Sequence, residues 1–450
     1  MRSLPSDHAE QGRHVDREQR VTQGTSLSTP SSIDLSQDGR QVETLASELG
    51  LDMTPGVLMA SGAVLDLTGL QALLDALHMR GYQVLGPTLR DGALVLAEIS
   101  TLDDLPRGIG DEQEAGRYRT RHRGDASLFG FAATAQSAKP VLFPADERLW
   151  RGTRTGSGFD VTRENGETGE PAPVAVLGVR GCDLAAIAIH DTVLLSRNAV
   201  DVHYASRRDR SLLIAVTCAT PAGTCFCASM GTGPRPGEGA DLILTELLDA
   251  DGHRFLVESQ SPAGADVLAS LPTIEATTAD RESAQRVVTE ATMQMGRQMR
   301  TDDLRDLLYA SAESPRWNDV ADRCLACTNC TMVCPTCFCT SVEDVSDLSG
   351  DVDERHRVWD SCFSMEYSRL HGGAVRTSTS ARYRQWLTHK LAAWTDQFGM
   401  SGCVGCGRCI TWCPAAIDIT AEVTALREDA AHREATPAGP RAPTLPSTDR

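Results

Sequence analysis

Short apolar runs alternate with stretches of helical periodicity between residues 44 and 277. One stretch has leucines at the three- and four-residue spacing of a helix face: Leu67, Leu70, Leu73, Leu74 and Leu77. This spacing predicts an amphipathic helix. Residues 93–99 (ALVLAEI) and 140–143 (PVLF) are short apolar runs beside glycine or proline, and we expect both to be strands.

The strongest pattern in this half is a strand, a turn and a helix in residues 174–190. The run VAVLGV predicts a buried strand, a glycine-containing turn follows, and DLAAIAIH predicts a helix. Residues 212–216 (LLIAV) predict a second buried strand. These patterns predict an α/β or α+β domain over residues 44–277.

The C-terminal half has a different pattern. Residues 279–299 are rich in Ala, Glu, Gln, Arg and Met, which predicts a helical connection over 278–300, and residues 302–310 continue the pattern. We expect a largely helical domain over residues 301–428. The polar and Pro-, Ser- or Thr-rich ends, residues 1–43 and 429–450, are expected to be a disordered arm and a disordered tail, because they contain few large apolar residues.

Composition narrows the class of protein. The net charge of −18 disfavours nucleic acid and anionic membrane surfaces as partners. Near the N-terminus there is no apolar signal segment, and apolar runs stay far below the roughly 18 residues that span a bilayer. We therefore expect a cytoplasmic protein, in a compartment where thiols stay reduced and bind metals rather than form disulfides.

Eight of the 15 cysteines form two copies of the spacing C-x-x-C-x-x-C-x-x-x-C-P, which is the bacterial ferredoxin ligand pattern for [4Fe–4S] clusters. In proteins with two such clusters, the fourth cysteine of each run binds the other cluster. This predicts two crossed sets of ligands. Set 1 is Cys324, Cys327, Cys330 and Cys413, and set 2 is Cys403, Cys406, Cys409 and Cys334.

A structural zinc site is the alternative interpretation of these motifs. Zinc takes two C-x-x-C pairs and needs neither a third cysteine two residues further on nor a Cys-Pro step. Two complete copies therefore favour a bacterial-ferredoxin-type 2[4Fe–4S] core. Gly405 and Gly407 are expected to let the backbone approach the inorganic sulfides, where amide groups tune the potential.

The remaining seven cysteines leave alternatives open. The letters TCFC occur twice, at residues 224–227 and 336–339. Four N-terminal cysteines, here called set 3, either bind a third [4Fe–4S] cluster or are buried small hydrophobic residues. Set 3 is Cys182, Cys218, Cys225 and Cys227. The other three, Cys337, Cys339 and Cys362, either pack structurally or form a further site or redox pair.

Motifs of catalysis are missing from the sequence. No G-x-G-x-x-G opens a helix after a strand, and the prolines in residues 231–239 (GTGPRPGEG) indicate a surface loop instead. Neither a Ser/His/Asp set nor paired carboxylates stand out, so we assign no catalytic residue. The pattern indicates an electron-transfer subunit rather than a stand-alone enzyme.

Five segments carry a resemblance to a known family. They are residues 178–187 (GVRGCDLAAI), 218–234 (CATPAGTCFCASMGTGP), 316–339 (RWNDVADRCLACTNCTMVCPTCFC), 359–362 (WDSC) and 403–414 (CVGCGRCITWCP). Weaker likeness occurs at residues 81–87, 116–119 and 128–131. The chain resembles the beta, iron–sulfur subunit of sulfhydrogenases, which are NAD(P)-linked nickel–iron hydrogenases, and is closely similar to the electron-relay subunit of anaerobic sulfite reductase. Gly181 stands where this family often has proline, and both residues suit a turn.

The resemblance implies a relay subunit. Electrons from NAD(P)H would enter through an FAD subunit, pass along the clusters, and leave to a small iron–sulfur subunit beside the nickel–iron subunit. In the sulfite reductase alternative the same relay feeds a siroheme subunit. The resemblance also favours set 3 as cluster ligands. A redox sensor or scaffold is a further alternative, which the acidic charge and the lack of a basic helix disfavour.

Overall fold

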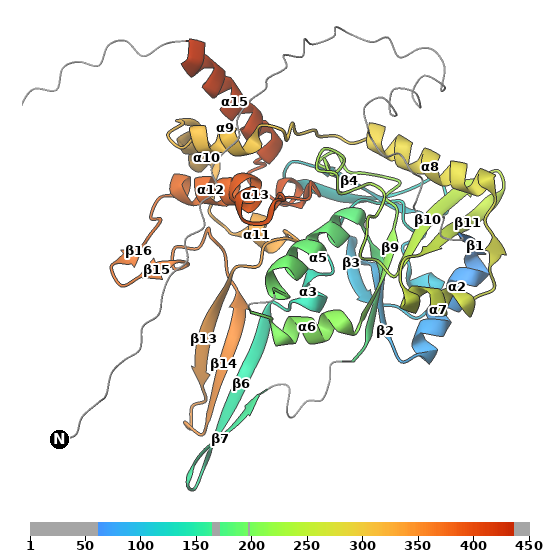
Figure 1. Ribbon diagram of the computed structural model, residues 1–450, viewed down its shortest axis with the longest axis horizontal. Coiled ribbons are helices and arrows are strands. Elements are labelled where there is room, and N and C mark those ends of the chain that lie inside the picture. Colours follow the sequence, from blue (N-terminus) through green and yellow to red (C-terminus); the bar gives the residue numbers. More distant parts are fainter. Residues whose placement is uncertain (1–61, 164–171, 197–198, 436–450) are drawn as a thin grey trace, which may run out of the picture. The chain divides into compact units, whose positions relative to one another are not determined.

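The predicted strand, turn and helix lie at the centre of the N-terminal half (Figure 1). Strand β8 (Val174–Val179) is an inner strand of an eight-stranded sheet, and helix α5 (Gly181–Leu194) follows it directly. Strand β9 (Ser211–Val216), also predicted, pairs with β8 in parallel. The computed structural model describes residues 62–163, 172–196 and 199–435, so the arm predicted at residues 1–43 lies outside the described residues.

The sheet has the strand order β12-β1-β11-β10-β9-β8-β2-β3. Neighbouring strands from β10 to β2 are parallel, and the pairs toward both edges are antiparallel. The bounds of the other strands are β1 Ala63–Asp66, β2 Gln83–Arg90, β3 Ala93–Glu98, β10 Leu242–Asp249, β11 Gly252–Ser259 and β12 Ile274–Glu275. Strand β3 is the strand predicted at residues 93–99.

Helices cover both faces of this sheet because its inner strands are apolar on both sides. Leu212 and Ile214 of β9 belong to a core with α2 (Leu67–Met79) and α7 (Pro262–Ala269). The alternate residues Leu213 and Ala215 belong to a second core with α3, α5 and α6 (Val202–Asp209). The predicted α/β class of this half is confirmed, and α2 is the predicted leucine-rich helix.

Two local predictions need correction. Residues 140–143 do not form a strand, because Lys139–Leu142 is one helical turn, α3. Pro140 lies in its first turn, where a missing N–H leaves no bond unmade. The predicted helical connection is α8 (Thr278–Met293), and it ends before Gly296, whose backbone lies so close to Gly223 that a Cβ atom would meet it at 2.2 Å.

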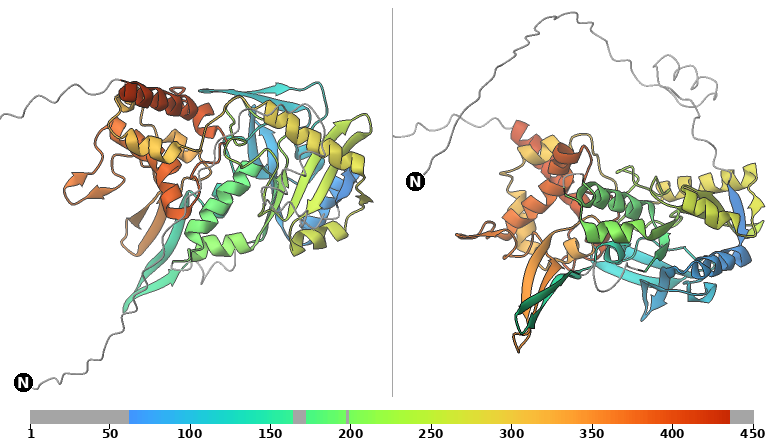
Figure 2. Two further views of the ribbon diagram at one scale, coloured as in Figure 1. Left: turned by 45° about the horizontal axis from the view of Figure 1, so that its top comes forward. Right: turned by 60° about the horizontal axis from the view of Figure 1, so that its bottom comes forward.

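A second sheet, which was not predicted from the sequence, joins the two halves. The hairpin of β6 (Asp146–Thr155) and β7 (Gly158–Arg163) pairs with that of β13 (Thr340–Ser346) and β14 (Val352–Trp359), in the order β13-β14-β6-β7. The two hairpins lie side by side in every view of Figures 1 and 2. The segment between the two ferredoxin-type motifs is therefore partly β-structure.

Helices supply most of the rest of the C-terminal half. They are α9 Leu304–Ala310, α10 Arg316–Arg323, α11 Asn329–Met332, α12 Thr379–Thr388, the π-helix η2 His389–Ala393, α13 Trp394–Phe398, α14 Arg408–Thr411 and α15 Ile419–Ala435. Small elements complete the fold: η1 Leu102–Asp104, β4 Ile109–Glu114, β5 Arg117–His122, β15 Arg369–Leu370 and β16 Gly373–Ala374. Within the described ranges, no helix is long and apolar enough to cross a membrane.

The C-terminal boundary lies later than predicted. Helix α15 continues to Ala435, so residues 429–435 belong to it rather than to a disordered tail. Their composition explains the difference, because alanine, glutamate and arginine are strong helix formers. Residues 436–450 lie outside the described residues.

Candidate metal centre

The two ferredoxin-type motifs have the same backbone path. Each places its third cysteine in a helical turn, Cys330 in α11 and Cys409 in α14. The residues before each turn are left-handed at equivalent positions. Their φ angles are 49° at Ala326 and 67° at Thr328 in the first motif, and 64° at Gly405 and 74° at Gly407 in the second. These turns bring thiols two residues apart to one side of the loop.

The thiols of set 1 lie within electrostatic reach of one another. Burial raises the pKa of Cys330, and the charges of Cys324, Cys413 and Cys327 raise it further. Burial likewise raises the pKa of Cys324, with Cys413 and Cys327 adding to the effect. Cys413, which belongs to the second motif, is thus placed among the first three cysteines of the first motif.

Set 2 is brought together in the reciprocal way. Burial raises the pKa of Cys403 to about 12, and the charges of Cys406 and Cys334 contribute. The pKa of Cys409 is also raised, by burial and then by Cys403, Cys406 and Cys334. The crossed combination that the spacing predicts is therefore the one that the fold places together, and the role of each thiol as an iron ligand stays a prediction.

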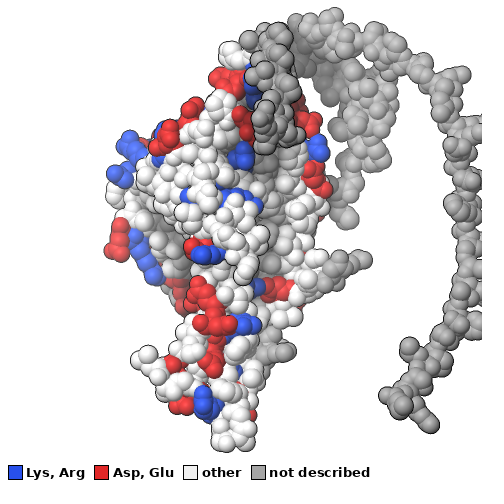
Figure 3. All heavy atoms as spheres, turned by 90° about the vertical axis from the view of Figure 1, so that its left-hand side faces the viewer, with Lys and Arg blue, Asp and Glu red and all other residues white. Residues whose placement is uncertain are grey.

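The surroundings of set 1 suit an iron–sulfur cluster. All four of its thiols line one pocket with the aromatic side chains of Phe363, Tyr383 and Trp386. Cys327 is exposed at the surface. Figure 3 shows the side of the molecule on which this helical region lies, where acidic and basic side chains are interspersed with uncharged surface. Thiolates that converge on an apolar pocket are the donor set of a [4Fe–4S] cluster.

Set 3 also converges, on the far side of set 2. Cys182 lies in the first turn of α5, Cys218 follows β9, and Cys225 and Cys227 lie in the next loop. All four are buried, between 5% and 9% exposed. Burial raises the pKa of Cys227 to about 12, with contributions from Cys218 and Cys406. In the described part of the chain, no three His, Cys, Asp or Glu side chains are arranged to hold a metal ion.

The loop that carries set 3 packs directly on the second motif. The Phe226 N–H donates to the Gly405 carbonyl at 2.9 Å, and the hydroxyls of Thr224 and Thr411 share a hydrogen bond of 2.7 Å. A Cβ on Gly405 would lie 2.7 Å from the backbone of Cys227, and one on Gly407 would lie 2.5 Å from the carbonyl of Thr224. Both glycines are therefore required by this close packing, whatever they contribute near the sulfides.

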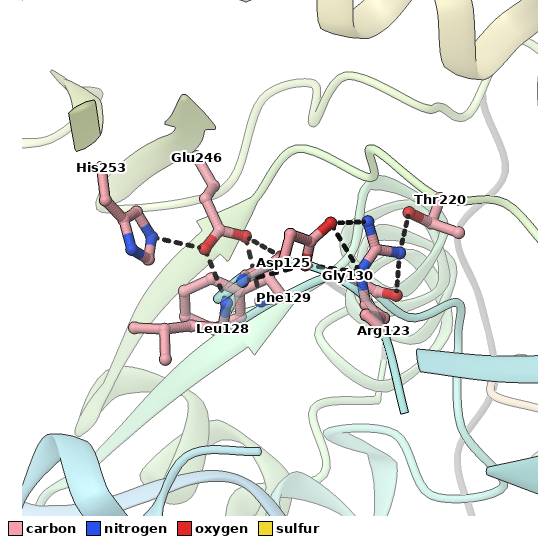
Figure 4. A network of polar contacts seen from close by, with 9 residues as sticks. Arg123, Asp125, Leu128, Phe129, Gly130, Thr220, Glu246 and His253 are labelled. Atoms are coloured by element: carbon pink, nitrogen blue, oxygen red, sulfur yellow. Dashed lines mark hydrogen bonds and ion pairs between the residues drawn. The ribbon is translucent and has the colours of Figure 1, made fainter. Parts of the chain in front are cut away.

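A buried carboxylate holds the chain that leads to set 3 (Figure 4). Glu246 accepts hydrogen bonds from the Leu128 N–H at 2.6 Å, the Phe129 N–H at 3.0 Å and His253 at 2.8 Å. Burial would raise the pKa of Glu246, but these bonds outweigh it and the pKa is lowered. The carbonyl of Phe129 in turn accepts from Arg180, two residues before Cys182. The network thereby fixes the turn that carries the first thiol of set 3.

The other three cysteines form contacts within pairs. The Cys337 thiol donates a hydrogen bond to Cys334 of set 2, so Cys337 has a raised pKa and Cys334 a lowered one. Cys339 accepts a hydrogen bond from Cys362, which lowers the pKa of Cys339 to about 6, and Tyr367 contributes. The structure thus divides these cysteines between a neighbour of set 2 and a pair near set 1.

Two buried lysines beside set 2 were not predicted from the sequence. Lys390 of η2 donates to the Cys334 sulfur at 3.3 Å, and Lys139 of α3 donates to the Cys334 carbonyl at 3.3 Å. One signal in the sequence marks them, because they are the only lysines in the chain.

The fold and the site define the class of this protein. Residues 323–417 match the 4Fe-4S dicluster domain family, and this span includes every cysteine of sets 1 and 2. The protein is an iron–sulfur electron-transfer protein.

Over 262 residues the chain is 31% identical to the "Sulfhydrogenase 2 subunit beta" of Pyrococcus furiosus, a match that covers 56% of this chain and 74% of that subunit. The chain belongs to the family of sulfhydrogenase beta subunits, which confirms the resemblance found in the sequence. No solved structure matches the chain.

Proposed function

We propose that the chain relays single electrons through three [4Fe–4S] clusters, held by sets 1, 2 and 3. The relay connects an FAD subunit that reacts with NAD(P)H to the small iron–sulfur and nickel–iron subunits of a sulfhydrogenase complex. The family to which the chain belongs supports this assignment of partners. The clusters supply one-electron redox chemistry, and the protein holds them, tunes them and excludes water from them.

One observation carries the proposal: set 2 adjoins both other sets. Cys409 of set 2 is within electrostatic reach of Cys330 in set 1. On the other side, the Cys225 thiol of set 3 contacts the carbonyl of Cys406 at 3.7 Å. Three neighbouring sites support electron transfer, because tunnelling between redox centres weakens steeply with distance.

The first experiment measures iron and acid-labile sulfide in the anaerobically purified full chain, followed by EPR after dithionite reduction. We expect about twelve irons, four for each cluster, and Cys225→Ser should lower the count by about four. About eight irons with an unaffected variant would remove set 3 from the relay. Zinc without sulfide would overturn the proposal.

The second experiment tests the direction of the relay in the assembled complex. NAD(P)H should reduce the clusters only when the FAD subunit is present, and hydrogen should reduce them only when the nickel–iron subunit is present. Siroheme in the purified complex would instead identify the sulfite reductase alternative and contradict the proposed partners.

A further inference from the structure

The only two lysines of this chain meet at one place. The sequence has 43 basic residues, and all except Lys139 and Lys390 are arginine. Lys139 is 5% exposed and Lys390 is 6% exposed, although lysine is among the residues least often buried. Both contact Cys334, the residue through which the first motif contributes to set 2. A chain that uses arginine everywhere else therefore places lysine at a single proposed cluster.

The hydrogen bonds of Lys390 require a charged ammonium group. Its Nζ donates to the Cys334 sulfur at 3.3 Å, to the Thr336 hydroxyl at 2.7 Å and to the Gly402 carbonyl at 3.1 Å. The Thr336 hydroxyl donates its own proton to the Gly402 carbonyl at 2.8 Å, so it accepts from Lys390. All three contacts therefore use a proton of Lys390, and only an ammonium group has three.

Lys139 adds a second positive charge nearby. Its Nζ donates to the carbonyls of Cys334 at 3.3 Å and Cys337 at 2.9 Å, and it lies 3.5 Å from the centre of the Trp359 ring. These partners are carbonyl dipoles and a π face. Neither lysine forms an ion pair with a carboxylate of the described residues, so neither charge is cancelled by a neighbouring anion.

Set 1 has no such cations among the described residues. The hydrogen bonds that its thiols accept come from backbone amides, that of Ala326 to Cys324 and that of Ile417 to Cys413, each at 3.4 Å. At set 3 the buried guanidinium of Arg408 pairs with the Asp183 carboxylate at 2.8 Å, so that charge is compensated. Two uncompensated buried cations are thus a feature of set 2 among the three sites.

A buried cation affects the two redox states of a cluster unequally. Reduction adds one negative charge, and a fixed ammonium group a few ångströms away stabilises the more negative state more strongly, because the interior screens charge poorly. Charge and hydrogen bonds to sulfur are established means by which proteins set cluster potentials. Lysine suits this position better than arginine, because its donors radiate from one compact charge toward three acceptors.

We infer that Lys390 and Lys139 raise the reduction potential of the cluster held by set 2 above that of the cluster held by set 1. An electron that enters the dicluster therefore rests at set 2, the buried middle of the relay. This inference deepens the proposed function and rests on it, because it takes Cys334 as an iron ligand.

The test is a potentiometric EPR titration of the anaerobically purified full chain. In Lys390→Met, the ratio of reduced to oxidised set 2 cluster at a fixed potential should fall at least about tenfold, about 59 mV for a one-electron couple. The set 1 signal should not move. Lys390→Arg, which keeps the charge, should shift the set 2 signal less than Lys390→Met, and Lys139→Met should shift it in the same direction. Cys403→Ser identifies the set 2 signal by removing it.

Iron content and lysine labelling control for misfolding. A lysine-specific acylating reagent should label neither lysine in the native wild-type chain and both after unfolding. With full iron content, an unchanged set 2 potential in Lys390→Met, or equal shifts of both signals, would overturn the inference alone. A shift in Lys390→Arg as large as in Lys390→Met would also overturn it. A wild-type chain without cluster signals would overturn the proposed function, and the inference with it. If Lys390→Met loses iron, Lys390→Arg and Lys139→Met decide.

Discussion

Leu325 in the first motif and Val404 in the second occupy the same position between two cysteines, yet Leu325 is 68% exposed and Val404 is 2% exposed. The same contrast holds for the thiols, since Cys327 is exposed and its counterpart Cys406 is buried. One spacing therefore builds two ligand loops with the same backbone path and opposite surroundings. The spacing specifies ligand geometry, and the packing around each loop decides which one reaches the surface.

This contrast assigns different tasks to the two sites. Set 1 lies at the surface with an uncharged side chain exposed beside it, which suits electron exchange with another protein. Set 2 lies between set 1 and set 3 and is covered by the 218–234 loop, whose Thr232 hydroxyl donates to the Val404 carbonyl at 2.6 Å. Buried sites of this kind pass electrons within a chain.

The largest expected difference comes from one substitution at the equivalent apolar positions. Val404→Asp should destabilise the chain by at least about 3 kcal/mol, because it buries a carboxylate without a partner. Leu325→Asp should change the stability by no more than about 0.5 kcal/mol. Urea unfolding of both variants under anaerobic conditions measures the difference. Similar losses would show that the first loop is covered in solution.

A second matched pair tests the backbone. Gly405→Ala should cost about 2 to 3 kcal/mol, because its φ of 64° disfavours a side chain and the new Cβ would collide with the backbone of Cys227. Ala326 occupies the equivalent position with a φ of 49°, and Ala326→Gly should stay within about 1 kcal/mol of the wild type. Unfolding curves and iron content report both effects. A tolerated Gly405→Ala would mean that the set 3 loop does not pack on the second motif.

The smallest expected difference concerns the rate of iron loss. During anaerobic incubation with an iron chelator, about four irons should be released first, because set 1 is the more exposed site. Alkylation with mass spectrometry should then find Cys327 modified before Cys403. Release of all irons in a single phase, with both cysteines modified together, would contradict the difference in exposure.

Much of the local structure could be predicted from the sequence. The run from residue 174 to 190 folds as the expected strand and helix, because its apolar pattern and its turn agree with each other. The strand predicted at residues 140–143 fails for a local reason, since a four-residue apolar run that begins with proline also suits the first turn of a helix. The hairpin β13–β14 was missed, because its polar residues pair with a strand that lies far earlier in the chain.

By itself the sequence determined the two crossed sets of thiols and the class of protein, because ligand spacing acts over a few residues and the chain turns locally. Only the tertiary structure decided which set is buried, that the set 3 loop packs on Gly405 and Gly407, and that Lys139 and Lys390 meet at Cys334. These are contacts between segments far apart in the chain. Hydrophobic periodicity records which residues are buried, but it does not record which distant residue each one meets.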